Sequence, residues 1–240
     1  MKLYASSQIG IGKTENEDRM ILGRSVIAGG SFFTNIESGM VAIADGVGGN
    51  NAGAVASHFV AERLSKANTV DLELLTKINA DLILLSQTNP KYSNMATTLA
   101  GVHFAEGRTL VFHIGNTRVY TLQGGKYLKQ LTVDDTTFHY LITSGQLSAE
   151  EADSFEKKNE IIACLGGGTP TLFKAKLSNE DIVSTIMLTS DGIHDFLSTD
   201  ELEDVIDEFG ISLNACEKLI ELARHNGSTD DASVIMGGIE

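Results

Sequence analysis

Segments of strand length follow one another in runs along this chain, whereas its helical patterns come in two pairs. The segments with the apolar or alternating pattern of strands are 2–9, 20–27, 40–44, 97–104, 109–114, 119–122, 172–177, 182–188 and 233–236. Most connections between them are short, which favours antiparallel pairing because parallel strands need long crossovers. Apolar residues at helical spacing predict one helix pair and then a second, over 54–64 and 72–85 and over 199–209 and 213–225.

This order of elements predicts an α+β fold, in which sheets carry helices on their outer faces. The glycines at 124 and 125 predict a hairpin turn, and Ser198 or Thr199 is a suitable cap for the helix that follows. A polar stretch over 134–160 is interpreted as one or two short helices, around 138–143 and 149–155. With only two prolines and no low-complexity linker, the chain is predicted to be a single domain over 1–240.

The composition argues against several classes of protein. The formal charge is −14, from 32 acidic residues against 18 Lys and Arg, and nucleic-acid binding needs a basic surface instead. No apolar run has the length of a membrane span, and residues 1–8 lack the apolar stretch of a signal peptide. Cys164 and Cys216 form no CxxC motif and are expected to be reduced. We therefore expect a cytoplasmic protein that binds neither nucleic acid nor membrane.

Acidic residues stand at the ends of several predicted strands. The pairs concerned are Asp45-Gly46, Asp191-Gly192, Asp230-Asp231 and Glu17-Asp18. A strand end holds a carboxylate rigidly, and glycine lets the backbone carbonyl approach a ligand closely. Carboxylates that meet at one sheet end need hard cations to neutralise them, and Mg²⁺ and Mn²⁺ take such oxygen ligands. Each Asp-Gly pair alone is typical of a turn, so only the ordered set indicates a metal site.

Further short motifs accompany these acids along the chain. The pieces are 9–18, 44–49 with Gly53, 96–99, 113–120, 131–134, 165–166, 188–192 and 228–233. Each piece is modestly specific, but their order is highly specific. Together they resemble the metal-dependent protein phosphatases of the protein phosphatase 2C family, especially the short bacterial members. The resemblance extends from Ser7 to Met236.

The resemblance implies a four-layer α-β-β-α sandwich, with two antiparallel sheets packed face to face and a helix pair on each outer side. It also implies a site for two Mn²⁺ or Mg²⁺ ions at one end of the sandwich. The residues that match its metal ligands are Asp45, which would bridge both ions, the carbonyl of Gly46, Asp191 and Asp230, and, through waters, Glu17 and Asp18. A third ion would use Asp195 and the residue at 116.

The activity implied is hydrolysis of phosphoserine and phosphothreonine, with Asp45, Asp191 and Asp230 acting through a metal-activated water. Two cations that share a water lower its pKa, and the bridging hydroxide would attack phosphorus in line. The implied partners are phosphorylated proteins, the substrates of a Ser/Thr kinase, and we expect a monomer. The stretch 134–160 matches the family's flap beside the cleft, which is suited to choosing substrates.

Four positions depart from the family's pattern. Lys13 stands where the family has a phosphate-binding arginine, so we expect looser phosphate binding without the bidentate fork. Asn116 replaces an aspartate, and with Asp195 it should hold a third ion weakly or not at all. Asp231 replaces an asparagine and adds negative charge near the ions. Val47 stands where animal relatives carry a candidate acid histidine, so the general acid stays unassigned.

Two alternative functions are weighed against this hypothesis. A phosphatase-like regulatory or binding module with weak or no activity is motivated by Lys13 and Asn116. The intact Asp45, Asp191 and Asp230 argue against that module. A non-catalytic Ca²⁺-binding domain would need a D-x-[DN]-x-[DN]-G loop, which the sequence lacks.

Overall fold

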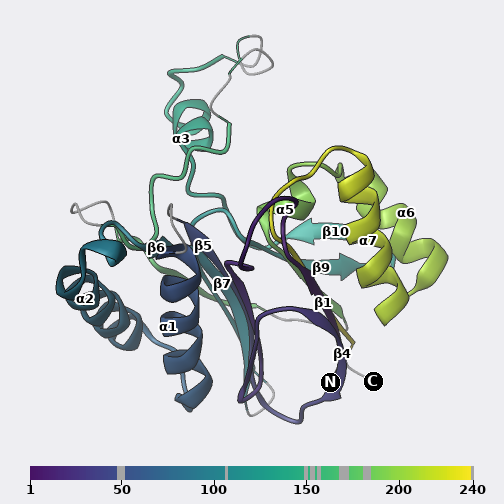
Figure 1. Cartoon of the computed structure of the whole chain (residues 1–240). Coiled ribbons are helices and arrows are strands. Elements are labelled where there is room, and N and C mark those ends of the chain that lie inside the picture. Colours follow the sequence, from purple (N-terminus) through teal and green to yellow (C-terminus); the bar gives the residue numbers. More distant parts are fainter. Residues whose placement is uncertain are drawn as a thin grey trace.

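The computed structural model describes residues 1–47, 52–105, 108–148, 151, 155, 158–167, 173–180 and 185–238. Within these residues the chain forms two antiparallel β-sheets flanked by helices (Figure 1). The first sheet contains, in order, β10 (Tyr127–Gln130), β9 (Arg118–Gln123), β13 (Thr185–Thr189), β14 (Ala232–Gly238), β1 (Lys2–Gln8) and β4 (Gly30–Asn35).

The second sheet lies against the first and carries one side branch. Its main path is β11 (Leu165–Gly166), β6 (Ala96–Thr97), β5 (Gly39–Val47), β7 (Leu99–Ala105), β8 (Arg108–Ile114) and β12 (Lys176–Glu180). Off this path, β2 (Asp18–Leu22) pairs with β5, and β3 (Ser25–Ile27) pairs with β2. The long strand β5 therefore has several neighbours along its length, and its final residues reach the end of the sandwich.

A helix pair covers the outer face of each sheet, so the predicted four-layer sandwich is confirmed. Helix α1 (Ala52–Lys66) lies against β5 and β2 beside α2 (Leu72–Thr88), while α7 (Leu213–His225) lies against β1 and β14 beside α6 (Thr199–Phe209). The short elements are η1 (Pro90–Tyr92), α3 (Thr137–Thr143) and α5 (Asp191–His194). No helix in the described ranges combines the length and hydropathy needed to cross a membrane.

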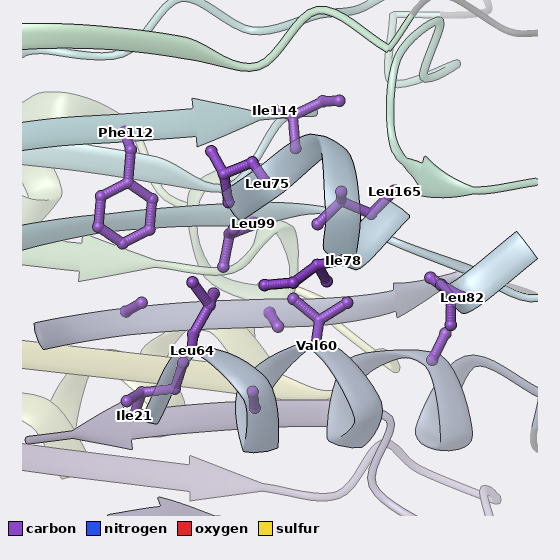
Figure 2. Close-up of a cluster of buried hydrophobic side chains, with 14 of the residues drawn as sticks. Ile21, Val60, Leu64, Leu75, Ile78, Leu82, Leu99, Phe112, Ile114 and Leu165 are labelled. Atoms are coloured by element: carbon purple, nitrogen blue, oxygen red, sulfur yellow. The ribbon is translucent and has the colours of Figure 1, made fainter. Parts of the chain in front are cut away.

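Three apolar clusters hold these layers together. In the first, Val60 and Leu64 of α1 and Ile78 of α2 meet Leu99 and Phe112 of the second sheet, as Figure 2 shows. A second cluster fills the space between the sheets and includes Leu3, Ile43, Leu188 and Ile235. The third joins α6 and α7 to the first sheet through Leu202, Leu219 and Met236. Each fully buried Leu or Ile contributes roughly 1.5–3 kcal/mol relative to an exposed side chain.

The helix boundaries follow from local capping. The predicted helices 199–209 and 213–225 coincide with α6 and α7. Ser198 and Glu201 form a capping box, in which each side chain accepts a hydrogen bond from the other's backbone N–H. Asp71 caps α2 by accepting from the N–H of Leu74 at 2.7 Å. These bonds need only neighbouring residues, so the sequence alone indicates where the helices start.

Several strand boundaries differ from the prediction. The single strand expected over 20–27 is two strands, because Gly23 adopts φ +63° and turns the chain between β2 and β3. β4 was not predicted, since the adjacent Phe32 and Phe33 interrupt an alternating pattern. The strand expected over 172–177 begins only at Lys176 as β12, and residues 172 and 182–184 lie outside the described residues.

Two turn regions bear on the site. The hairpin predicted at Gly124-Gly125 is confirmed: both residues have positive φ and join β9 to β10. The stretch 134–160, called the flap below, leaves the sandwich after β10, and Figure 1 shows α3 standing beyond one end of the sheets. The predicted helix over 138–143 is confirmed as α3. The helix predicted over 149–155 lies outside the described residues except at 151 and 155.

Candidate metal centre

Four of the six residues predicted to hold two ions lie at one end of the second sheet. Asp18 and Asp45 are direct cross-strand neighbours in the antiparallel pair β2–β5. Gly46 donates its N–H to the carbonyl of Glu17 at 3.1 Å, which places these two residues side by side. The register of one strand pair thus brings together Glu17, Asp18, Asp45 and Gly46, although 27 positions separate the Asp18–Asp45 pair in sequence.

The other predicted ligands lie at one end of the first sheet. Asp191 follows β13 and Asp230 precedes β14, and these strands are antiparallel neighbours. The N–H of Ser190 donates to the carbonyl of Ser233 at 3.1 Å and continues the pairing to the strand ends. Because one strand ends where its antiparallel neighbour begins, both aspartates emerge at the same edge.

The two sheet ends meet around the carboxylate of Asp18. Its Oδ2 accepts hydrogen bonds from the hydroxyls of Ser190 at 2.9 Å and Ser233 at 2.7 Å, both from the opposite sheet. The carboxyl groups of Asp45 and Asp191 also lie close enough to shift each other's pKa. The acids from distant parts of the chain therefore converge between the sheets.

Backbone contacts fix Asp45 and Gly46 in place. The carbonyl of Asp45 accepts from the N–H of Thr98 and from the hydroxyl of Thr97, each at 2.8 Å. A Cβ at Gly46 would lie 2.3 Å from the carbonyl oxygen of Gly53, and a Cβ at Gly53 would lie 2.6 Å from Glu17 Oε1. Only glycine permits this approach, which seats the start of α1 against the acids.

Placing these carboxylates together raises their proton affinity. The pKa of Asp18 is raised to about 7, mainly by burial. Burial and the neighbouring charges of Asp191 and Asp18 hold the pKa of Asp45 well above its ordinary value. Burial and the charge of Asp230 raise the pKa of Asp191. The arrangement is electrostatically costly unless protons or cations neutralise it.

The donor set fits a hard divalent cation. Glu17 Oε1, Asp18 Oδ1 and Asn116 Oδ1 are buried oxygens without a hydrogen-bond partner in the described part of the chain. Unpaired buried oxygens are rare in folded proteins, and carboxylate and amide oxygens are the ligands that Mg²⁺ and Mn²⁺ prefer. No three His, Cys, Asp or Glu side chains of the described residues already have metal-ligand spacing, so an ion would rearrange some of these contacts.

Lys13 lies among the acids. Its Nζ contacts Asp230 Oδ1, lies 2.9 Å from Asp231 Oδ2 and lies 3.6 Å from Glu17 Oε2. The ammonium group therefore neutralises part of the cluster, which is a role that the sequence did not suggest. Whether it also binds phosphate stays a prediction.

Asp231 has a part that sequence reasoning missed. Its buried carboxylate accepts from the N–H groups of Gly10 at 2.7 Å and Glu17 at 2.8 Å, besides the ion pair with Lys13. It ties the segment that carries Lys13 and Glu17 to the start of β14. The sequence signalled only an extra charge at this position, since burial and partners depend on the folded chain.

The two residues proposed for a third ion are both hydrogen-bonded to Asp191, Asn116 to its side chain and Asp195 to its carbonyl. Asn116 donates from Nδ2 to Asp191 Oδ2 at 3.1 Å, and its Oδ1 is one of the unpaired oxygens. Asp195 follows α5 and accepts from Asn159 of the flap at 2.5 Å. Its pKa is raised to about 7 by burial and then by the charge of Asp191. The flap is thus hydrogen-bonded to the edge of the acid cluster.

A cavity of about 900 Å³ lies between the flap and the first sheet. Its lining includes Arg118, Asp134, Phe138, His194 and Asp195. Arg118 donates to both carboxylate oxygens of Asp134 at 2.6–3.1 Å and forms a rigid part of the wall. Sequence reasoning did not identify Arg118, because its partner lies across a turn of the fold. The cavity adjoins the acid cluster through Asp195.

These raised pKa values predict a pH-dependent stability. Asp18 and Asp195 have a folded-state pKa of about 7 against an unfolded value of 3.8, so the folded chain binds more protons between these values. The stability that these two protonated carboxyl groups contribute is fully present below pH 3.8 and is lost as the pH rises through 7. We expect the thermal midpoint of the metal-free protein to fall from pH 5 to pH 8, by scanning calorimetry.

Added Mn²⁺ should raise that midpoint more at pH 8 than at pH 5, because protons compete with the ion for the same carboxylates. Asp18→Asn removes a titrating group and should flatten the fall of the metal-free midpoint. A metal-free midpoint that rises between pH 5 and pH 8 would contradict the assignment.

Known proteins resemble the chain in both sequence and structure. The sequence model of the protein phosphatase 2C family matches residues 31–224. The serine/threonine protein phosphatase PstP of Mycobacterium tuberculosis is 30% identical over 250 positions, which cover 100% of this chain and 45% of that protein. The serine/threonine phosphatase stp of Listeria monocytogenes is 27% identical over 221 residues, or 87% of each chain.

Solved structures agree with this relationship. The crystal structure of the Mycobacterium tuberculosis serine/threonine phosphatase PstP/Ppp is 28% identical, has a TM-score of 0.81 and covers 100% of both chains. Stp1 from Staphylococcus aureus, with 22% identity and a TM-score of 0.79, shares the fold over 99% of this chain and 94% of that one. The chain therefore belongs to the protein phosphatase 2C family, and it is an enzyme of the protein phosphatase class.

Proposed function

We propose that this phosphatase hydrolyses phosphoserine and phosphothreonine in proteins, using a water activated by bound divalent ions. The observation that supports the proposal best is the convergence of Asp18, Asp45 and Asp191 from two sheets, with unpaired oxygens beside them. Relatives named serine/threonine phosphatases support the choice of substrate.

The proposed ligands divide between the two sheets. Asp45 would contact two ions, with the carbonyl of Gly46 on one side and Asp191 and Asp230 on the other. Glu17 and Asp18 would act mostly through waters. When bound, Mn²⁺ or Mg²⁺ supplies the positive charge that acidifies a shared water and offsets charge on the phosphoryl oxygens. The backbone of these residues is held in place, because each adjoins a paired strand or a hydrogen-bonded turn.

A third ion is proposed to bind weakly, near Asn116 and Asp195. The amide of Asn116 offers one neutral oxygen and uses its nitrogen on Asp191. Asp195 is hydrogen-bonded to Asn159, so an ion would compete with a flap contact. Both features reduce the gain from a further cation.

The flap cavity is proposed to receive residues that flank the phosphorylated side chain. It adjoins the acids through Asp195, and Phe138 and Phe155 supply an aromatic wall with ring centroids 5.8 Å apart. Most of the other lining residues are polar or charged, which suits the polar backbone and side chains of a peptide. The substrates would be proteins phosphorylated by a Ser/Thr kinase, and we propose a cytoplasmic monomer.

A regulatory module with little activity is the alternative. The ion pair of Lys13 with Asp230 favours it, because it occupies an oxygen that an ion would need. Activity assays separate the two functions.

Asp45→Asn removes the charge of the residue proposed to contact both ions. We expect Mn²⁺-dependent hydrolysis of a phosphothreonine peptide to fall about a hundredfold or more. Substitution of residues that only orient metal ligands already lowers metal affinity or activity about 10–100-fold. Asp71→Asn is the matched control: it keeps a good cap on α2. Asp71 follows the far end of α1, whose 15 residues span about 22 Å from the end that lies at the site.

Equal turnover by wild type and Asp45→Asn would contradict the proposed site. A wild-type protein that binds Mn²⁺ but shows no turnover on any phosphopeptide would favour the regulatory module instead.

Lys13→Arg tests the phosphate contact. A guanidinium can bind phosphate through two parallel hydrogen bonds, so we expect KM to fall severalfold for both a phosphopeptide and a small aryl phosphate, with kcat little changed. Lys66→Arg, at an exposed lysine paired with Glu62, should leave KM unaltered. If Lys13→Arg leaves KM at the wild-type value, Lys13 serves the acid cluster and not the substrate.

Phe138→Ala tests the flap cavity. Loss of the aromatic wall should raise KM for a phosphothreonine peptide severalfold and leave hydrolysis of a small aryl phosphate unchanged, because the small ester has no flanking residues. Tyr140→Ala is the control, since Tyr140 is 54% exposed on the same helix and does not line the cavity. Equal effects of both substitutions, or none on the peptide, would remove the cavity from the substrate path.

A further inference from the structure

Arg224 makes an unusual set of contacts at the end of α7. Its Nη1 donates to the carbonyls of Ser228 at 3.1 Å and Asp230 at 2.5 Å. Its Nη2 donates to the carbonyls of Ile9 at 3.0 Å and Gln8 at 3.5 Å. One guanidinium group therefore joins two backbone segments that are more than two hundred positions apart.

The two segments are packed directly on each other. The N–H of Ile11 donates to the carbonyl of Thr229 at 2.9 Å, and the N–H of Gly10 donates to Asp231 Oδ1 at 2.7 Å. A Cβ at Gly10 would lie 2.6 Å from the Thr229 carbonyl oxygen, so only glycine allows this contact. The first segment leads to Lys13, and the second carries Asp230.

A third part of the site rests on the same loop. The hydroxyl of Ser228 donates to the carbonyl of Gly192 at 2.8 Å, and Arg224 Nη1 lies 3.4 Å from that hydroxyl. A Cβ at Gly192 would lie 2.0 Å from the carbonyl oxygen of Asp231. The loop after α7 is therefore held between Gly10 and Gly192, next to Asp191.

This loop determines where the Asp230 carboxylate lies. The Asp230 side chain is 50% exposed, so its position depends on its backbone, on the Lys13 contact and on the N–H of Asp231, which donates to Oδ1 at 2.8 Å. The loop starts at Gly227, whose φ of +100° turns the chain away from the path of α7. Without the guanidinium, the carbonyls of Asp230 and Ile9 would lose the donor that joins them. Small shifts of a ligand weaken metal binding, because the ligand must then be ordered when the ion binds.

We propose that Arg224 is a positioning residue that joins the loops carrying Asp230 and Lys13, and thereby sets the affinity of the site for divalent ions. This rests on the proposed function of Asp230 as a metal ligand. A purely structural part is the competing explanation, since a cation in the last turn of a helix also stabilises that helix. The two explanations differ in whether metal affinity changes apart from stability.

The test compares Arg224→Met with Arg63→Met. Arg63 also lies in the last turn of a helix, stacks on Phe59 and pairs with Asp81 at 3.7 Å, so the control removes the same charge without touching the site loops. Mn²⁺ binding is measured by titration calorimetry on the full chain without substrate. Thermal midpoints in a chelator and kcat at saturating Mn²⁺ are measured alongside.

We expect Arg224→Met to raise the Kd for Mn²⁺ about tenfold, the size typical of residues that orient metal ligands. Turnover at saturating Mn²⁺ should stay within about twofold of wild type, since the loaded site restores the position of Asp230. Arg63→Met should leave the Kd unchanged. Arg224→Lys, which keeps the charge and one donor direction, should recover part of the affinity.

An unchanged Kd in Arg224→Met, or an equal rise in Arg63→Met, would overturn the inference. A lower thermal midpoint of Arg224→Met in the chelator, with no loss of Mn²⁺ affinity, would also overturn it, because that result indicates a purely structural role. A wild type that binds no Mn²⁺ would overturn the proposed function as well. A wild type with Mn²⁺-dependent turnover and an unaltered Arg224→Met would overturn only this inference.

Discussion

Mutual repulsion among buried carboxylates is the constraint around which this structure is organised. Asp18, Asp45 and Asp191 come from two sheets and all have raised pKa values. Such a cluster lowers the stability of the fold, because each buried anion costs several kcal/mol before compensation. Hydroxyl donors from Ser190 and Ser233 offset only part of that cost. The sandwich therefore holds a cluster of acids at one end, and its apolar clusters provide the stability that offsets the cost of burying them.

The rest of the site is arranged so that these acids cannot move apart. Glycines at 46, 53 and 192 allow backbone segments to touch where any side chain would clash. The Asp231 carboxylate accepts hydrogen bonds from backbone N–H groups and pairs with Lys13, and so joins two segments of the chain. Arg224 does the same from the outside through carbonyl groups. Together these contacts make the positions of the acids a property of backbone geometry, while the flap is a separate extension that contacts the cluster through Asp195.

The accuracy of the sequence-based predictions followed the range of the forces involved. Helices α6 and α7 matched their predicted limits because caps and amphipathic spacing are local. Strands were less accurate, as β2 and β3 show: the turn at Gly23 depends on a contact with the carbonyl of Met40 in a neighbouring strand. The edge strand β4 went unnoticed, since both faces of its Phe-Phe pair are partly exposed and no alternation marks it. Strand identity reflects pairing more than propensity.

The sequence by itself determined the inventory of this protein: which residues are acidic, which turns are glycine, where helices begin, and which family motifs stand in which order. Only the tertiary structure decided how that inventory is used. Asp231 is buried and joins two segments, Lys13 pairs with the acids, and Arg224 joins two loops, yet each is an ordinary charged residue in the printed sequence. The physical reason is that burial, desolvation and partners across the two sheets set what a charge does, and these depend on register and packing between residues far apart in the chain.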